Sequence, residues 1–165
     1  MTLPLAAVVA GDKMAEQLTD ANVRDQLRAH FEAIGLPNAA IEWLLSLWTT
    51  IQALDDVADG DPVENAESLP WTVLIGMPSN VFFRDNAQWL QPVVANMYLK
   101  WRAANRAEEN GRADEQSFMW RAGYYDVVMQ VVLLVHGPVK AAELSETTMR
   151  LYGETFAQYR KEFHA

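Results

Sequence analysis

Residues 39–60 read AAIEWLLSLWTTIQALDDVADG, and this stretch decides the fold. Its apolar residues recur at helical spacing. At about 100° per residue they form one arc of a helix, made of Leu44, Leu47, Ile51, Leu54 and Ala58. The pattern predicts an amphipathic helix over residues 39–59, and Gly60 favours the left-handed backbone that ends a helix.

Helical periodicity also dominates the rest of the chain. The expected helices span residues 19–33, 39–59, 79–109, 113–136 and 139–163. Residues 62–76 are harder to assign because Leu69-Pro70 breaks the helical pattern. We therefore expect an all-α single domain over residues 1–165, a bundle of five or six helices, with residues 1–11 as a loosely ordered N-terminal arm.

Two local choices remain within this scheme. Residues 127–135 read VVMQVVLLV, and their β-branched content would also suit a buried strand. A lone strand has no partner in an otherwise helical chain, so a buried helix is preferred. Ser79 or Asn80 is expected to cap the helix that runs to about residue 109.

The composition is that of a folded, acidic protein. Of the 165 residues 50% are hydrophobic, the formal net charge is −9, and cysteine is absent. The charge argues against nucleic acid as a partner, and the absence of cysteine excludes disulfides and thiolate metal sites. The apolar runs at residues 3–10 and 127–135 are far shorter than the ~20 residues of a membrane span. We expect a cytoplasmic protein without a membrane partner, with a homodimer as one candidate assembly.

An aspartate cluster, Asp55, Asp56, Asp59 and Asp61, closes the helix predicted from the first stretch. Helix C-termini carry partial negative charge, so these carboxylates need solvent, a cation or a metal ion beside them. Asp55 and Asp59 share a face at the boundary between core and solvent, with Gln52 beside Asp59. Such carboxylates bind Mg²⁺ together with substrate phosphate oxygens. We therefore expect Asp55, Asp56 and Asp59 to be metal ligands, with Asp61 and Gln52 around them. The alternative is a solvated helix end in which Asp61 caps the next helix.

The segment Asp55-Asp56-Val57-Ala58-Asp59 resembles the DDxxD motif of class I terpenoid (isoprenoid diphosphate) synthases. That motif also lies near the C-terminal end of a helix in an all-α bundle. The resemblance implies a class I terpenoid synthase-like fold, Asp55 and Asp59 as magnesium ligands, and a secondary role for Asp56. It further implies a diphosphate-bearing small molecule as ligand. The chain lacks the second metal motif of that family, so the resemblance implies the fold and the diphosphate site rather than a complete cyclase.

Asp126 lies in an apolar stretch, where an unpaired carboxylate would be costly. Its candidate partners are Lys100, Arg102 and Arg121. In a second interpretation Asp126 is an opposing carboxylate that faces the aspartate cluster across a site. Lys100, Arg102 and Arg106 are also candidates for phosphate binding, against the alternative of an exposed helix face.

Two further functions stay open. An all-α nucleotide pyrophosphatase also binds Mg²⁺ through carboxylates on helices, and Glu108-Glu109 is the nearest candidate pair. A non-enzymatic helical interaction or accessory protein, of the kind that mobile elements encode, would instead use aromatic residues of the helix over residues 79–109 as a partner surface. The enzyme classes require that the cluster and Asp126 converge on one cavity.

Overall fold

The computed structural model describes residues 20–163, which are all helix or loop and contain no strand. The all-α expectation is confirmed for this part of the chain. The described residues form two compact units, residues 20–87 and residues 88–163. The expectation of a single domain stays a prediction, and the expected arm over residues 1–11 lies outside the described residues.

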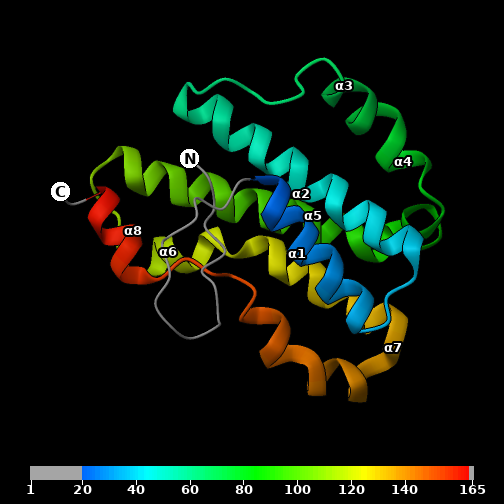
Figure 1. Ribbon diagram of the computed structural model, residues 1–165. Helices are drawn as coiled ribbons and strands as arrows, with labels where there is room; N and C mark the ends of the chain where they lie inside the picture. Colours follow the sequence, from blue (N-terminus) through cyan, green and yellow to red (C-terminus); the bar gives the residue numbers. More distant parts are fainter. Residues whose placement is uncertain (1–19, 164–165) are drawn as a thin grey trace. The chain divides into compact units, whose positions relative to one another are not determined.

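The first unit contains α1 (Asp20–Ala33), α2 (Asn38–Asp59), α3 (Leu69–Trp71), the π-helical turn η1 (Thr72–Gly76) and α4 (Met77–Ser79) (Figure 1). Helix α5 (Val81–Glu109) begins in this unit and continues in the second. The second unit also contains α6 (Glu115–Arg121), α7 (Gly123–Met149) and α8 (Phe156–Phe163). Because α3, η1 and α4 are continuous, residues 20–163 form seven helices rather than the expected five or six.

Helices α1 and α2 lie side by side and follow the sequence pattern closely (Figure 1). α1 buries Val23, Leu27 and Phe31, which recur once per turn on one face. α2 ends at Gly60, whose backbone adopts φ 79° and whose N–H donates to the Asp56 carbonyl. The predicted bounds of both helices are confirmed within a residue. Gly60 fixes the end of α2, whereas its start, after Pro37, has no side-chain cap.

The segment Leu69–Ser79 corrects the expectation drawn from Leu69-Pro70. Pro70 lies in the first turn of α3, where its missing N–H costs no helical hydrogen bond. The dipeptide therefore starts a helical segment instead of breaking one. Asn80 then caps α5, as expected: its Oδ1 accepts from the Phe83 N–H at 3.1 Å. Its Nδ2 donates to the Ala39 carbonyl at 2.9 Å and ties this cap to α2.

The second unit departs further from the expected boundaries. The single helix expected over residues 113–136 is divided between α6 and α7, with Ala122 between them at ψ 9°. The helix expected over residues 139–163 is also divided, because the chain leaves helical geometry after Met149 and resumes it at Phe156. The strand alternative for residues 127–135 is wrong, since they lie in α7.

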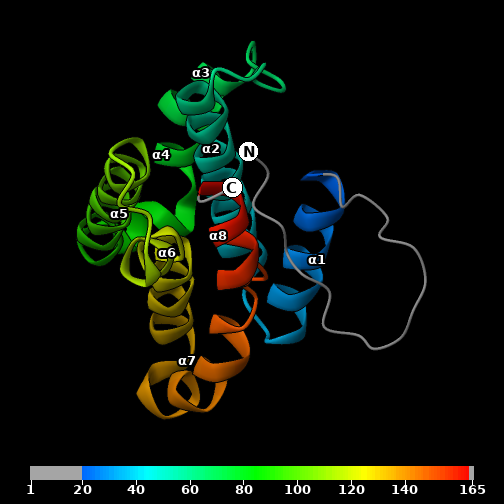
Figure 2. The same cartoon turned by 90° about the vertical axis from the view of Figure 1, so that its left-hand side faces the viewer.

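Helix α7 is broken at Gly137, which has φ 78° and ψ 174° and precedes Pro138. Figure 2 shows α7 reversing direction between its yellow and orange parts. By length and composition alone, α7 is the one helix among residues 20–163 that would suit a membrane span. Gly137 breaks this helix, and 28% of its apolar window is buried; core helices of soluble proteins pass the same test of length and composition.

Candidate functional site

The aspartate cluster at the end of α2 spans several environments. Asp55 is buried at 6% exposure, Asp56 is half-buried, and Asp59 and Asp61 are exposed. The predicted apolar arc is wrong in its last turns, because Leu54 and Ala58 are exposed. The buried face passes instead through Ile51, Gln52 and Asp55. Tertiary packing of α2 sets this face, and hydrophobicity alone placed it too far toward Leu54.

The cluster is partly organised by the helix end itself. The Asp56 carbonyl accepts from the N–H groups of Gly60 and Asp61, the latter at 2.8 Å. Asp61 does not cap the next helix, because that helix begins only at Leu69. Asp55, Asp59 and Asp61 all have interaction partners. Within residues 20–163 no three His, Asp or Glu side chains are grouped to hold a metal ion. The magnesium site stays a prediction.

A cavity of about 360 Å³ lies between α1, α2 and the loop after α2. We call it the α2 cavity. Its charged and amide lining residues are Arg24, Asp25, Gln52, Asp56, Glu64 and Asn65. Of the three predicted metal ligands, Asp56 lines this cavity, and Asp55 and Asp59 do not. Gln52, expected beside the ligands, also lines it.

Asp126 finds one of the partners expected from the sequence. Lys100 Nζ lies 2.6 Å from Asp126 Oδ2, and both side chains are about one-third exposed, at 35% and 37%. Asp126 is therefore paired but only partly buried. It lines a second cavity, of about 280 Å³, together with Gln130 from the same arm of α7 and Ser145 from beyond the Gly137 break. None of the α2 aspartates lines that cavity.

The basic residues of α5 fit an exposed helix face. Lys100 is engaged with Asp126, and Arg102 and Arg106 are exposed. The Arg102 guanidinium lies 5.8 Å from the Trp101 ring. Nothing in this arrangement brings the three cations to one point, and their phosphate-binding role stays a prediction.

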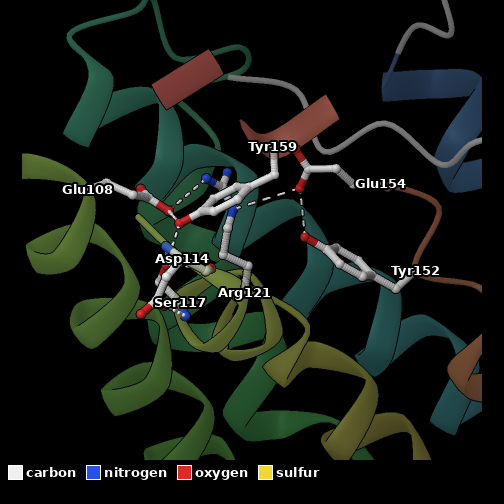
Figure 3. A network of polar contacts seen from close by, with 7 residues as sticks. All are labelled: Glu108, Asp114, Ser117, Arg121, Tyr152, Glu154 and Tyr159. Atoms are coloured by element: carbon white, nitrogen blue, oxygen red, sulfur yellow. Dashed lines mark hydrogen bonds and ion pairs between the residues drawn. The ribbon is translucent and has the colours of Figure 1, made fainter. Parts of the chain in front are cut away.

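The second unit contains a buried polar network that the sequence did not predict (Figure 3). Arg121, whose side chain is 5% exposed, lies 3.0 Å from Glu108 Oε1 and 4.0 Å from Glu154 Oε2. The Tyr159 hydroxyl donates to Glu108 at 3.0 Å and lies 2.6 Å from Ser117 Oγ. The network joins the end of α5 to α6 and α8, and Arg121 pairs here rather than with Asp126.

Two signals in the sequence could have revealed this network. Asp114 and Ser117 form a capping box at the start of α6: Asp114 Oδ1 accepts from the Ser117 N–H at 2.9 Å. Arg121 is the only cation of that short helix. Glu108, on which the pyrophosphatase alternative depended, is already bound to Arg121 and Tyr159. The network is therefore interpreted as structural.

Burial also affects the tyrosines around this network. The Tyr152 hydroxyl donates to Glu154 at 2.7 Å, and burial followed by the nearby carboxylate raises its pKa well above the usual range. Burial is also the first cause that raises the pKa of Tyr159 to about 12. Both side chains stay protonated at neutral pH and donate hydrogen bonds instead of acting as bases.

The segment Leu69–Ser79 exposes four large apolar side chains within five positions. Trp71 and Leu74 are 69% and 70% exposed, and Val73 and Ile75 between and beside them are also exposed. None of the residues in α3, η1 or α4 is buried. We call Trp71, Val73, Leu74 and Ile75 the apolar ridge.

No protein-family model, curated protein or solved structure matches this chain. The geometry of the described residues is therefore the basis for a functional proposal. It offers the apolar ridge and the α2 cavity, both in the first unit.

Proposed function

We propose that this chain is a non-enzymatic helical interaction protein and that the apolar ridge is its contact surface. The observation that carries this proposal is the exposure of Trp71 and Leu74 in an ordered helical segment. Burying one such side chain is worth about 1.5–3 kcal/mol, and exposed apolar patches of this kind mark interaction sites. A partner that covers the ridge would gain this free energy.

The exposed aromatic residues of α5 give weaker support. Trp89 and Tyr98 are both exposed. At about 100° per residue they project from opposite sides of the helix, so that they do not share one surface. Trp71, Leu74 and Ile75 of the ridge are three and four positions apart in one helical segment, a spacing that places side chains on the same helix face.

Charge indicates the kind of partner. The last residue of α2 and the loop before the ridge carry exposed acidic residues, Asp59, Asp61, Glu64 and Glu67. A second copy of this chain would bring another net charge of −9 and the same acidic loop. We therefore propose a different protein, with an apolar face bordered by Lys and Arg, because opposite charges at the rim speed association and suppress wrong partners.

A photo-crosslinking amino acid at position 74 tests this proposal in cells that express the chain. The same group at Gln88, an exposed position outside the ridge, is the matched control. We expect position 74 to capture a basic partner that position 88 misses. The purified partner should bind the wild type, lose affinity when salt is raised, and bind Leu74→Glu at least about tenfold more weakly.

Other outcomes would contradict the proposal. If the affinity of the partner changes neither with salt nor in Leu74→Glu, the ridge is not part of the contact surface. A wild-type dimer in sedimentation that becomes monomeric in Leu74→Glu would assign the ridge to a second copy.

We propose as a second candidate a class I terpenoid synthase-like fold with a magnesium-diphosphate site at the DDxxD motif. The observation that favours it is Asp56 on the wall of the α2 cavity. Thermal unfolding with Mg²⁺ and pyrophosphate should stabilise the wild type by about 2.7 kcal/mol at 100 times the dissociation constant. The Asp55→Ala/Asp59→Ala variant should lose this shift, and a Glu67→Ala/Asp85→Ala control should retain it. A shift with Mg²⁺ alone, or an equal shift in both variants, would reject the site.

A further inference from the structure

The α2 cavity has more negative than positive charge on its walls. Three acidic residues, Asp25, Asp56 and Glu64, line it, and Arg24 is the one cation among its lining residues. Carboxylates accept hydrogen bonds and do not donate them. The charged part of the wall therefore favours a ligand with a protonated amine.

Hydroxyl groups add further acceptors to this wall. Thr49, Ser68 and Thr72 line the cavity, and each donates its hydroxyl proton to a backbone carbonyl, at 3.0, 3.1 and 3.2 Å. Their oxygens keep free lone pairs, because a hydroxyl has one proton to give and two pairs to accept with. An ammonium group has three N–H donors and can bind to these carboxylate and hydroxyl acceptors.

Gln52 indicates, independently, that the ligand also carries a hydrogen-bond acceptor. Its side chain lines the cavity, the residue is only 5% exposed, and its Nε2 has no acceptor among the described residues. Buried donors without partners are rare and costly. Together with Arg24, Gln52 calls for an oxygen acceptor on the ligand.

We propose that the α2 cavity binds a small zwitterion, a free α-amino acid. Its ammonium group lies toward Asp25, Asp56 and Glu64, and its carboxylate lies toward Arg24 and the Gln52 amide. A plain amine would leave the buried Gln52 donor without an acceptor and would not pair with Arg24, and a plain acid would face three carboxylates. The volume of about 360 Å³ falls within the range of small-molecule sites. Thr72 on the cavity wall lies between Trp71 and Val73 of the apolar ridge, but the proposal does not depend on the interaction proposed above.

Calorimetric titration of the full chain tests the proposal. The probes are the free L-amino acids, each compared with the amine that lacks its carboxylate and the acid that lacks its amine. We expect at least one amino acid to bind and both truncated forms to bind about tenfold more weakly or worse, because each loses charge-assisted hydrogen bonds.

Two variants sharpen the test. Glu64→Gln should weaken binding about tenfold, whereas Glu67→Gln, an exposed carboxylate of the same loop outside the cavity, should leave it unchanged. Gln52→Leu removes the unpaired donor and should abolish binding while the ligand-free protein unfolds at the same or a higher temperature.

The proposal is overturned if no free amino acid binds, if the amine alone binds as well as the amino acid, or if Gln52→Leu binds normally. Stabilisation by Mg²⁺ with pyrophosphate and by no amino acid would assign the cavity to the metal site instead. Leu74→Glu is expected to lose partner binding and to keep amino acid binding. The two proposals can therefore be rejected independently of each other.

Discussion

Two clusters of carboxylates in this protein differ in how their negative charge is compensated. In the second unit, Arg121 lies between Glu108 and Glu154, and all three side chains are at most 10% exposed. In the first unit, the aspartates at the end of α2 sit where the helix dipole already opposes them, and Asp56 faces an open cavity. The cluster around Arg121 is closed to solvent, and its one guanidinium and the tyrosine hydroxyls serve two carboxylates, which leaves a formal charge of −1. The cluster at the end of α2 keeps excess negative charge beside a cavity, where a ligand can gain free energy by binding.

The largest loss of stability is expected for Arg121→Met, which removes the cation of the buried cluster. This change leaves Glu108 and Glu154 buried without their cation, and it should lower the free energy of unfolding by about 3–5 kcal/mol in urea titrations. Arg150→Met removes the exposed Arg150–Glu146 pair and is the control, with a change below about 1 kcal/mol. A loss in Arg121→Met no larger than in the control would show that the network contributes little.

High pH probes the same cluster through Tyr159. Its pKa is raised to about 12 in the folded protein, against about 10 when unfolded. Above pH 10 the unfolded chain loses this proton first, so stability present below pH 10 is lost as pH rises to 12. The slope from one group is at most about 1.4 kcal/mol per pH unit. Tyr159→Phe should flatten the decline in unfolding experiments between pH 9 and about 12. An unchanged slope would exclude Tyr159 as a contributor.

Gly60→Ala tests how far the end of α2 is fixed by its backbone. No atom lies within 4 Å of the position that a Cβ would occupy, so the cost comes only from φ 79°. We expect a loss of about 1–2 kcal/mol in thermal unfolding. Gly60→Asn, which tolerates this conformation better, should recover part of the loss. Equal stability of all three proteins would mean that the α2 end rearranges freely.

The smallest effect is expected for Asp56→Asn. Removing a half-buried negative charge from a helix C-terminus among other carboxylates should change stability by less than about 0.5 kcal/mol, toward greater stability. Chemical unfolding at low salt is the measurement, with the same titration at high salt as control. Destabilisation above about 1 kcal/mol would show that Asp56 has a structural partner. The α2 cluster would then stabilise the fold, as the cluster around Arg121 does.

The parts of the fold that the sequence predicted well are those with local causes. α1 and α2 follow helical periodicity, and Gly60 and Asn80 act through their own backbone or side chain at the expected helix ends. The prediction for Leu69-Pro70 was wrong because proline both breaks a helix and begins one, and the conformation of the next residues decides between the two. The split between α6 and α7 depends on one residue, Ala122, whose side chain carries no such signal.

The candidate site was predicted only in part. Lys100 was named as a partner of Asp126 because a carboxylate among apolar residues needs a cation. The Glu108–Arg121–Glu154 network was missed because its members are far apart in the chain. The apolar ridge was missed because exposure cannot be read from composition, and consecutive apolar residues suit a buried core equally well.

The sequence by itself determined the helical class, the bounds of α1 and α2, and the concentration of negative charge at the end of α2, because periodicity, caps and charge act over a few residues. Tertiary structure decided which aspartate is buried, which one faces a cavity, and that Gln52 lacks an acceptor among the described residues. A helix turns about 100° per residue, so a small rotation set by packing exchanges buried and exposed positions. That rotation decides which of the neighbouring carboxylates is available to a ligand.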